Sequence, residues 1–292
     1  MEDFRARFSQ KLDEVDNLPT ISSVYIALQA ALSNMAAGAE DVAKVISEDM
    51  SLTAKVLRIV NSAYFSAASG PIASVSKAVA RIGFAEIRRI CSALEIIRSF
   101  KALQRAINSE DFWKHCLMTA ITTKVIDQYR ATPSDFNEDT AYVSGLLHDV
   151  GQLLLNCYFP EVFKEVIHRA ESDNTPYADV ERNMLGMDHG EMAGMLLERW
   201  HFPEAIIQAV NWHHEPGLAP EKYRSLAQTI HLADFICRSL GIGTSLGSIS
   251  SARRFYDNVW ADLGVSVDDL PAIIDRVNKE EQRCVTIIAA ES

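Results

Sequence analysis

The stretch Ser144-Gly-Leu-Leu-His-Asp-Val-Gly-Gln152 decides how the rest of the chain is interpreted. Its residues are mostly apolar or small, and three leucines follow at 153–155, which predicts a helix buried on most of its surface. A carboxylate beside an imidazole, at His148 and Asp149, is costly in such a helix unless something pairs with it. A bound metal cation would provide that partner, since imidazole and carboxylate are ordinary ligands of first-row metals. The alternative is a core histidine satisfied by a hydrogen bond to the aspartate.

Composition limits the class of protein. The 292 residues could form one large domain or two ordinary ones, and 48% hydrophobic with 23% charged residues is typical of a globular chain. The net charge of −11 gives no general attraction to phosphate backbones, so we do not expect nucleic acid as a partner. The only basic cluster consists of the arginines at 81, 88, 89 and 98.

The cysteines and the first residues indicate the compartment. Five cysteines are widely spaced among apolar neighbours, and no Cys-x-x-Cys pair occurs. This pattern predicts buried thiols in a reducing compartment rather than a disulfide framework or a zinc knuckle. The first residues contain no apolar signal core, and no stretch approaches 18 uncharged apolar residues. We therefore expect a cytoplasmic protein with no membrane partner.

Apolar residues recur with helical periodicity, and no strand-period alternation appears in the first half of the chain. The stripes and breaks predict helices over residues 2–14, 21–32, 52–61, 76–82, 85–100, 112–129, 163–170, 203–214, 225–240, 253–263 and 267–283. The helix, tight turn and helix around Gly83 could be a DNA-reading helix-turn-helix. A packing turn within an α bundle is favoured, because the acidic balance opposes DNA binding.

One long block resembles a known family. Val45-Ile-Ser-Glu-Asp-Met-Ser-Leu-Thr-Ala-Lys-Val-Leu-Arg-Ile-Val-Asn-Ser-Ala-Tyr-Phe65 is similar to the HDOD family, the HD-related output domains of bacterial signalling. The similarity begins near Leu18-Pro19 and continues through Ile72-Ala-Ser-Val-Ser-Lys-Ala-Val-Ala-Arg-Ile-Gly83, so that it covers roughly residues 15–235. The resemblance implies an all-α fold in which an N-terminal helical lobe, 1–105, packs on an HD-type helical bundle, 106–240. A C-terminal helical extension, 241–292, would then supply closing helices.

Polar residues interrupt the apolar stripes of the second half. His115 has apolar neighbours, which suggests the buried face of its helix, where a lone histidine is more often a satisfied core residue than a ligand. His213 and His214 fall at a helix end, because Pro216 forces the preceding residue out of helical geometry. The helix dipole there favours a cation, and a polar helix end that faces water is the alternative. Asp234 has apolar neighbours and needs a partner.

A helix start is predicted just after residue 187. Asp188 can cap that helix, and Glu191 three residues later completes a capping-box pattern. Asp188 is then structural rather than chemical. The cap places His189 in the first helical turn, from which a ligand can point into the end of a cleft.

Taken in order, these residues reproduce the pattern of the HD metal-dependent phosphohydrolases, which many HDOD members have lost. The resemblance implies one metal site formed by His115, His148, Asp149 and Asp234. It implies a second site formed by His189 with one or both of His213 and His214, with Asp149 bridging the two. Helices from different parts of a bundle can bring such ligands to one core site. The expected cofactor is one or two divalent transition metal ions: iron, manganese or zinc.

Two departures argue against the substrate of the cyclic-di-nucleotide phosphodiesterases that carry a GYP motif. Those enzymes have lysine where this chain has Gln152, and Pro216-Gly-Leu-Ala-Pro220 stands in place of Gly-Tyr-Pro. The loss of a lysine charge beside a phosphate would weaken transition-state stabilisation.

We therefore expect a signal-transduction output module that acts by binding signalling protein partners or a ligand, for example a nucleotide or another phosphate-containing molecule. The alternative is a metal-dependent phosphohydrolase acting on a nucleotide or other phosphate ester, with Asp149 as the candidate catalytic residue. Asn61 and Tyr64 lie in the most specific block and are the expected binding residues of the N-terminal lobe. Their alternative roles are a helix-end cap for Asn61 and core packing for Tyr64.

Overall fold

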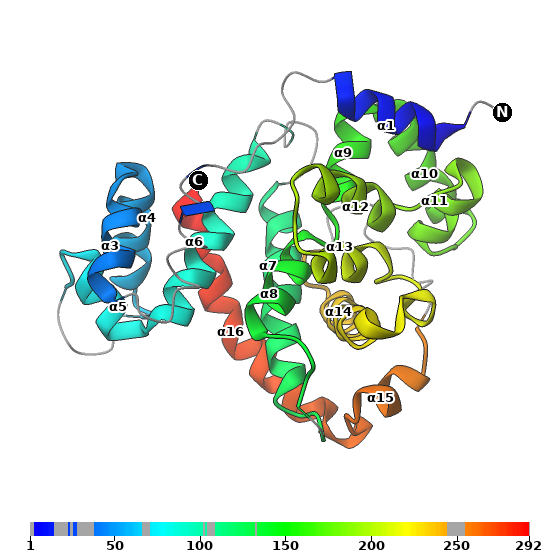
Figure 1. Cartoon of the computed structure of the whole chain (residues 1–292). Helices are drawn as coiled ribbons and strands as arrows, with labels where there is room; N and C mark the ends of the chain where they lie inside the picture. Colours follow the sequence, from blue (N-terminus) through cyan, green and yellow to red (C-terminus); the bar gives the residue numbers. More distant parts are fainter. Residues whose placement is uncertain are drawn as a thin grey trace. The chain divides into compact units, whose positions relative to one another are not determined.

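The computed structural model describes residues 3–14, 23, 26–27, 38–65, 71–101, 103, 109–131, 133–243 and 255–291. Over these residues every regular element is a helix and no strand occurs (Figure 1). The all-α class that the family resemblance implied, and with which the apolar periodicity agrees, is therefore confirmed. The predicted helix at 21–32 falls mostly outside the described residues. Among the described helices, none combines the length and the apolar character needed to cross a membrane.

Contacts within the chain divide it into two units. The smaller unit contains Pro19–Lys101 and Glu281–Ser292, and the larger unit contains Met1–Leu18 and Ala102–Glu280. Each unit thus combines segments that are far apart in the sequence. The domain boundaries near residues 105 and 240 stay a prediction.

The smaller unit is a set of short helices: α3 (Ala39–Ser47), α4 (Met50–Val60), α5 (Val75–Ile82) and α6 (Phe84–Ser99). Helix α3 packs on α4 and α5, and α5 packs on α6 (Figure 1). Gly83 joins α5 to α6 with a φ of +85°, a left-handed conformation that favours glycine. The last turns of α16 (Leu270–Glu291) also belong to this unit. There Arg283 lies 2.5 Å from Glu86, and Lys55 lies 2.6 Å from Glu291.

The centre of the larger unit consists of helices that are buried on most sides. Its elements are α1 (Phe4–Glu14), α7 (Ser109–Asp127), α8 (Glu138–Leu147), α9 (Val150–Tyr158), α10 (Pro160–Ser172), α11 (Tyr177–Leu185), α12 (His189–Arg199), α13 (Glu204–Asn211), η2 (Pro216–Leu218), α14 (Glu221–Ser239), α15 (Asn258–Leu263), η3 (Val267–Asp269) and the first part of α16. Helix α7 packs on α8 and α14, while α12 packs on α9 and α13 (Figure 1). These contacts place α7, α8, α9, α12, α13 and α14 around one buried region.

Some local expectations need correction. The helix expected at 253–263 begins only at Asn258 within the described residues, and the helix expected at 267–283 starts with a short 3-10 turn and runs on to Glu291. Four cysteines are buried as predicted, but Cys157 is exposed. The buried run of α9 ends at Asn156, so that the next side chain already faces solvent.

Candidate metal centre

His148 and Asp149 lie at the junction between two helices. The sequence predicted a continuous helix here, and this prediction was wrong: α8 ends at Leu147 and α9 begins at Val150. Asp149 has φ −99° and ψ 0°, which interrupts the helical geometry. Neighbouring side chains on an unbroken helix point about 100° apart. The break therefore lets His148 and Asp149 face the same region.

Two glycines allow other helices to approach this junction closely. A Cβ at Gly151 would lie 1.9 Å from the carbonyl oxygen of His189, and a Cβ at Gly145 would lie 2.8 Å from the Cα of Ala120. Real Cβ atoms essentially never come within 3.0 Å of another atom, so only glycine permits these approaches. Helix α12, which begins at His189, is therefore held directly against α9.

The structure brings together all seven residues that the sequence predicted as metal ligands: His115, His148, Asp149, His189, His213, His214 and Asp234. All except His214 are buried, and His214 is partly exposed. Asp149 Oδ1 lies 3.0 Å from Nε2 of His189, 3.4 Å from Nε2 of His148 and 3.9 Å from Nε2 of His213. On the other side, Asp234 Oδ1 lies 2.9 Å from Nε2 of His115.

Backbone carbonyl groups fix the tautomer of three of these imidazoles. The acceptor is the carbonyl oxygen of Gly145 for His148 (2.7 Å), of Val210 for His213 (2.7 Å) and of Ile242 for His115 (3.2 Å). Because a carbonyl oxygen only accepts, each Nδ1 donates its proton there, and the neutral ring presents a lone pair at Nε2. Within the described residues, Nε2 of His148, Nε2 of His213 and Oδ1 of Asp149 are buried with no hydrogen-bond partner.

His189 is held from behind by a carboxylate, Glu181, which the sequence alone did not single out. Glu181 Oε2 accepts from the backbone N–H of His189 at 2.9 Å and from its Nδ1 at 2.5 Å. Glu181 lies on α11 and is fully buried. A carboxylate in this position fixes the orientation of a metal-binding imidazole and raises its basicity. No local pattern distinguished Glu181 from an ordinary polar residue of an amphipathic helix.

An arginine that the sequence also left unnoticed pairs with both aspartates. Arg238 Nη2 donates to Asp149 Oδ2 and Arg238 Nε donates to Asp234 Oδ1, both at 2.6 Å. The Arg238 side chain is 33% exposed, so it stands where the buried centre meets solvent. Asp234 and Arg238 are four residues apart on α14 and therefore share a helix face. That spacing is the one signal that could have revealed the pair.

These contacts keep the two aspartates ionised. Burial alone would raise the pKa of Asp149, but His148 and Arg238 outweigh it and hold the pKa well below its usual range. Burial would likewise raise the pKa of Asp234, and Arg238 again reverses the effect. Both carboxylates therefore carry negative charge at neutral pH and need cations beside them.

Protons supply part of that positive charge in the absence of a metal. Burial lowers the pKa of His148, but Asp149 outweighs it and raises the pKa to about 9. In the same way Glu181 and Asp149 raise the pKa of His189 to about 10 against the effect of burial. Burial and the neighbouring imidazolium groups hold the pKa of His213 well below its usual range. A bound metal ion would displace the protons of His148 and His189.

The donor set fits a divalent first-row metal ion. Two groups have ligand atoms within 4.8 Å of one another: Asp149, His189, His213 and His214 form the first, and His115, His148 and Asp149 form the second. Imidazole nitrogen and carboxylate oxygen suit zinc, iron and manganese alike. Lone pairs that are buried without a donor need a cation. The larger unit therefore contains a possible metal site, in which Asp149 belongs to both groups.

Two further residues beside the centre match the sequence analysis. Asp188 and Glu191 form the predicted capping box, since each side chain accepts a hydrogen bond from the other residue's backbone N–H. Asp188 also pairs with Arg182, which supports its structural role. Gln152, where a GYP enzyme has lysine, is buried with Nε2 3.3 Å from Nε2 of His189. No cationic side chain therefore occupies position 152.

The two candidate binding residues of the smaller unit differ in their surroundings. Asn61 donates to the carbonyl oxygen of Ile72 at 2.8 Å and accepts from its backbone N–H at 2.6 Å. Its amide thus joins the end of α4 to the start of the following segment, which favours the structural alternative. Tyr64 is 37% exposed and contacts Phe65 edge-on, so it is not packed in the core. A role for either residue in binding stays a prediction.

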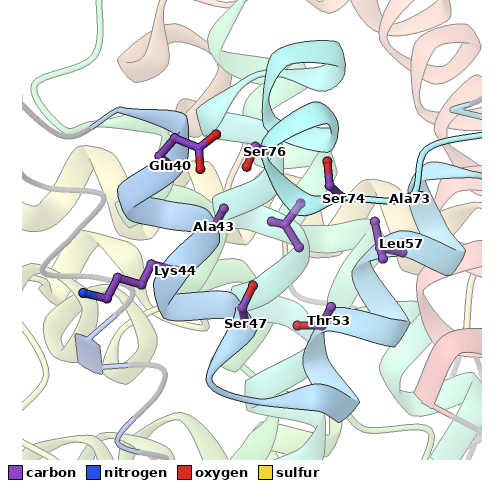
Figure 2. A pocket seen from close by; sticks show the side chains of 10 residues that line it. Glu40, Ala43, Lys44, Ser47, Thr53, Leu57, Ala73, Ser74 and Ser76 are labelled. Carbon is purple, nitrogen blue, oxygen red and sulfur yellow. The ribbon is translucent and has the colours of Figure 1, made fainter.

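The smaller unit also contains a pocket of about 350 Å³ between α3, α4 and α5 (Figure 2). Its lining includes several hydroxyl groups, but Thr53 donates to the carbonyl oxygen of Ile46 and Ser74 accepts from the backbone N–H of Lys77. The ammonium group of Lys44 points away from the other labelled side chains in Figure 2. The pocket therefore offers space for a ligand without a buried charged group that would select one.

Comparisons with known proteins identify one family and a shared fold. The HDOD domain family matches residues 18–216, which is more than half of the chain. An HDOD domain protein with unknown function from Geobacter sulfurreducens is 25% identical, with a TM-score of 0.75 and coverage of 98% of this chain and 97% of that one. A candidate signal transduction protein from Marinobacter aquaeolei VT8 is 20% identical, with a TM-score of 0.81 and coverage of 99% and 65%. A candidate phosphohydrolase from Shewanella amazonensis SB2B is 22% identical, with a TM-score of 0.71 and coverage of 98% of each chain.

A curated relative is considerably longer than this chain. It is an uncharacterised protein of Treponema pallidum (strain Nichols), 27% identical over 229 residues that make up 78% of this chain and 44% of that protein. The chain thus spans less than half of the length of this relative, and 65% of the Marinobacter chain. The likeness to the Marinobacter and Shewanella structures shows a shared fold.

Proposed function

Because this chain belongs to the HDOD family, we propose that it is a signal-transduction output module with a divalent metal centre in its larger unit. The module would act by binding signalling proteins or a phosphate-containing ligand. One observation carries the metal proposal: Nε2 of His148, Nε2 of His213 and Oδ1 of Asp149 are buried close together, and none of the three has a hydrogen-bond partner. A metal ion bound between these three atoms would be a ligand partner for each of them.

The distances support a division of the ligands between two positions. The first position would have Asp149, His189, His213 and His214 as its ligands, and the second would have His115, His148, Asp149 and Asp234. Nδ1 of each deeply buried imidazole donates a hydrogen bond to an acceptor, and for His189 this acceptor is the Glu181 carboxylate. Zinc, manganese and iron all suit this set of ligands.

Binding rather than catalysis is proposed as the main activity for two reasons. Position 152 holds a neutral glutamine within the centre, so the lysine charge that would hold a phosphate is replaced by an amide. The segment Pro216–Leu218 forms a 3-10 turn after the paired histidines instead of a GYP motif. The Marinobacter protein of the same fold is named for signal transduction.

Metal content tests the proposal. The protein purified without added metal should contain at least one equivalent of iron, manganese or zinc by inductively coupled plasma mass spectrometry. Asp149→Ala should lose this metal, because Asp149 belongs to both groups of ligands. His168→Ala is the matched control, since His168 is exposed on α10, and should keep it. A protein that contains no metal and takes up none on titration would overturn the proposal.

A metal-dependent phosphohydrolase is the second candidate, and the position of Asp149 favours it. Asp149 is close to histidines of both groups: Oδ1 lies 3.0 Å from Nε2 of His189 and 3.4 Å from Nε2 of His148, and Oδ2 lies 3.5 Å from Nε2 of His115, so this carboxylate could be a ligand at both positions. Bound ions would supply an activated water and hold the phosphate oxygens. The Shewanella protein of the same fold is named as a candidate phosphohydrolase.

Hydrolysis separates the two functions, whereas stability does not. Asp149→Ala should lower the melting temperature of a metal-bound protein under either function, because bound metal stabilises the folded state. We expect the wild type to hydrolyse cyclic di-nucleotides only at the background rate measured without protein. Turnover that needs added metal and disappears in Asp149→Ala would instead establish the enzyme.

A further inference from the structure

We propose that Arg238 takes the place of one metal ion, so that the centre binds a single ion tightly on the side of His189, His213 and His214. This inference rests on the proposed metal centre. The geometry points to it because the Arg238 guanidinium already joins the two carboxylates that a second ion would need. It donates to Asp149 Oδ2 and to Asp234 Oδ1, both at 2.6 Å.

The two contacts are those of a well-placed guanidinium. Asp149 comes from the junction of α8 and α9, and Asp234 comes from α14, so Arg238 joins two separate elements. An arginine presents its N–H donors in a rigid planar arrangement and stays charged at every relevant pH. It therefore gives both carboxylates a permanent cation, which an ion at the same place would have to displace.

The two carboxylate oxygens of Asp149 have different surroundings. Its Oδ2 accepts from Arg238, whereas its Oδ1 has no hydrogen-bond partner and lies 3.0 Å from Nε2 of His189, 3.4 Å from Nε2 of His148 and 3.9 Å from Nε2 of His213. Oδ1 is therefore the oxygen that can bind a metal ion without competing with Arg238. The His214 ring adjoins this side, with its Nε2 2.7 Å from that of His189.

The charges in the centre also fit one ion. The carboxylates at or directly behind the ligands are Asp149, Asp234 and Glu181, and all three are buried. Arg238 and one divalent ion together balance these three negative charges. Two divalent ions beside Arg238 would leave an excess of two positive charges in a buried place, which is costly.

Equilibrium dialysis of the purified full chain against manganese chloride, with bound metal counted by mass spectrometry, tests the inference. The wild type should bind one tight equivalent and Arg238→Met should bind two. Arg224→Met is the matched control and should bind one. Arg224 lies on the same helix, and its side chain donates to the carbonyl oxygen of Ala219 rather than to a carboxylate of the centre.

A second pair of variants locates the ion without removing Arg238. His189→Ala should lose the tight equivalent, whereas His115→Ala should keep it, because His115 lies on the side that Arg238 occupies. Two tight equivalents in the wild type, one in a folded Arg238→Met, or loss of the ion in His115→Ala would overturn the role of Arg238 and leave the metal centre standing. No uptake by the wild type or any variant would overturn the metal centre as well.

Discussion

Replacing Gly151 with alanine tests how closely α9 and α12 must approach for the centre to form. The added Cβ would lie 1.9 Å from the carbonyl oxygen of His189 and 3.0 Å from the backbone nitrogen of Ala193. Both are backbone atoms, so no side-chain rotation can relieve the contact. To restore even the 3.0 Å limit of real Cβ contacts, the first turn of α12 must move by about 1 Å.

That displacement sets the expected size of the effect. Overpacking of a tight contact costs about 1–3 kcal/mol. In a unit of this size each kcal/mol lowers the melting temperature by roughly 2–4 °C, so we expect a fall of about 2–12 °C for Gly151→Ala. The same movement carries His189 away from Asp149, and the proposed metal content should fall with it.

Gly217→Ala is the matched control for this experiment. A Cβ at Gly217 meets no atom within 4 Å, and its φ lies outside the left-handed region, so the control should melt like the wild type. Melting is followed by circular dichroism, and metal is measured on the same samples. If Gly151→Ala melts within about 1 °C of the control and holds as much metal, then the close approach is unnecessary and the reasoning is refuted.

Three further predictions concern the rest of the molecule. Burial raises the pKa of Asp49, but the first backbone N–H groups of α4 and the charge of Arg98 outweigh it, so the net shift is downward. The ionised Asp49 therefore stabilises the fold at neutral pH, and this stabilisation is lost as the pH falls through the lowered pKa. The free energy of unfolding in urea should be about 1 kcal/mol higher for the wild type than for Asp49→Asn at pH 7, and the two values should be equal near pH 2. Asn61→Ala removes both hydrogen bonds to Ile72 and should lower the free energy of unfolding by about 1–3 kcal/mol, and an unchanged urea midpoint would contradict this. In the native protein a thiol reagent should label Cys157 alone within minutes, because the other four cysteines are buried, and a second fast adduct in the mass spectrum would count against it.

The features that the sequence predicted well are those with local causes. The capping box of Asp188 and Glu191 needs only residues three apart, and it appears where expected. The steric restriction that Pro216 places on the preceding residue is equally local: Glu215 has φ −132° and ψ 62°, outside helical geometry. The break at His148 was not predictable in this way, because its apolar neighbours suit a continuous helix and the close contacts that accompany the break come from other helices.

The centre was predicted through resemblance more than through periodicity. From the residues alone, each single histidine had an equally plain role in the core or at a helix end. Arg238 and Glu181 escaped notice because a charged residue within a helix usually faces solvent, and nothing in the neighbouring sequence marked these two as different. What makes them important is the distance to Asp149 and to His189, and that distance arises from the packing of separate helices.

The last turns of α16 impose an order on how the chain can fold during synthesis. They supply the buried Cys284 and Ile287 to the smaller unit, together with ion pairs to Glu86 and Lys55. Residues 38–101 leave the ribosome about 180 residues before this segment, a delay of roughly 10–40 s at ordinary translation rates. At the end of that interval the larger unit has all of its own helices, whereas the early helices of the smaller unit still lack the segment that covers them. The larger unit can therefore complete its fold before the smaller unit, whose early helices stay incompletely covered, and open to chaperone binding, for longer.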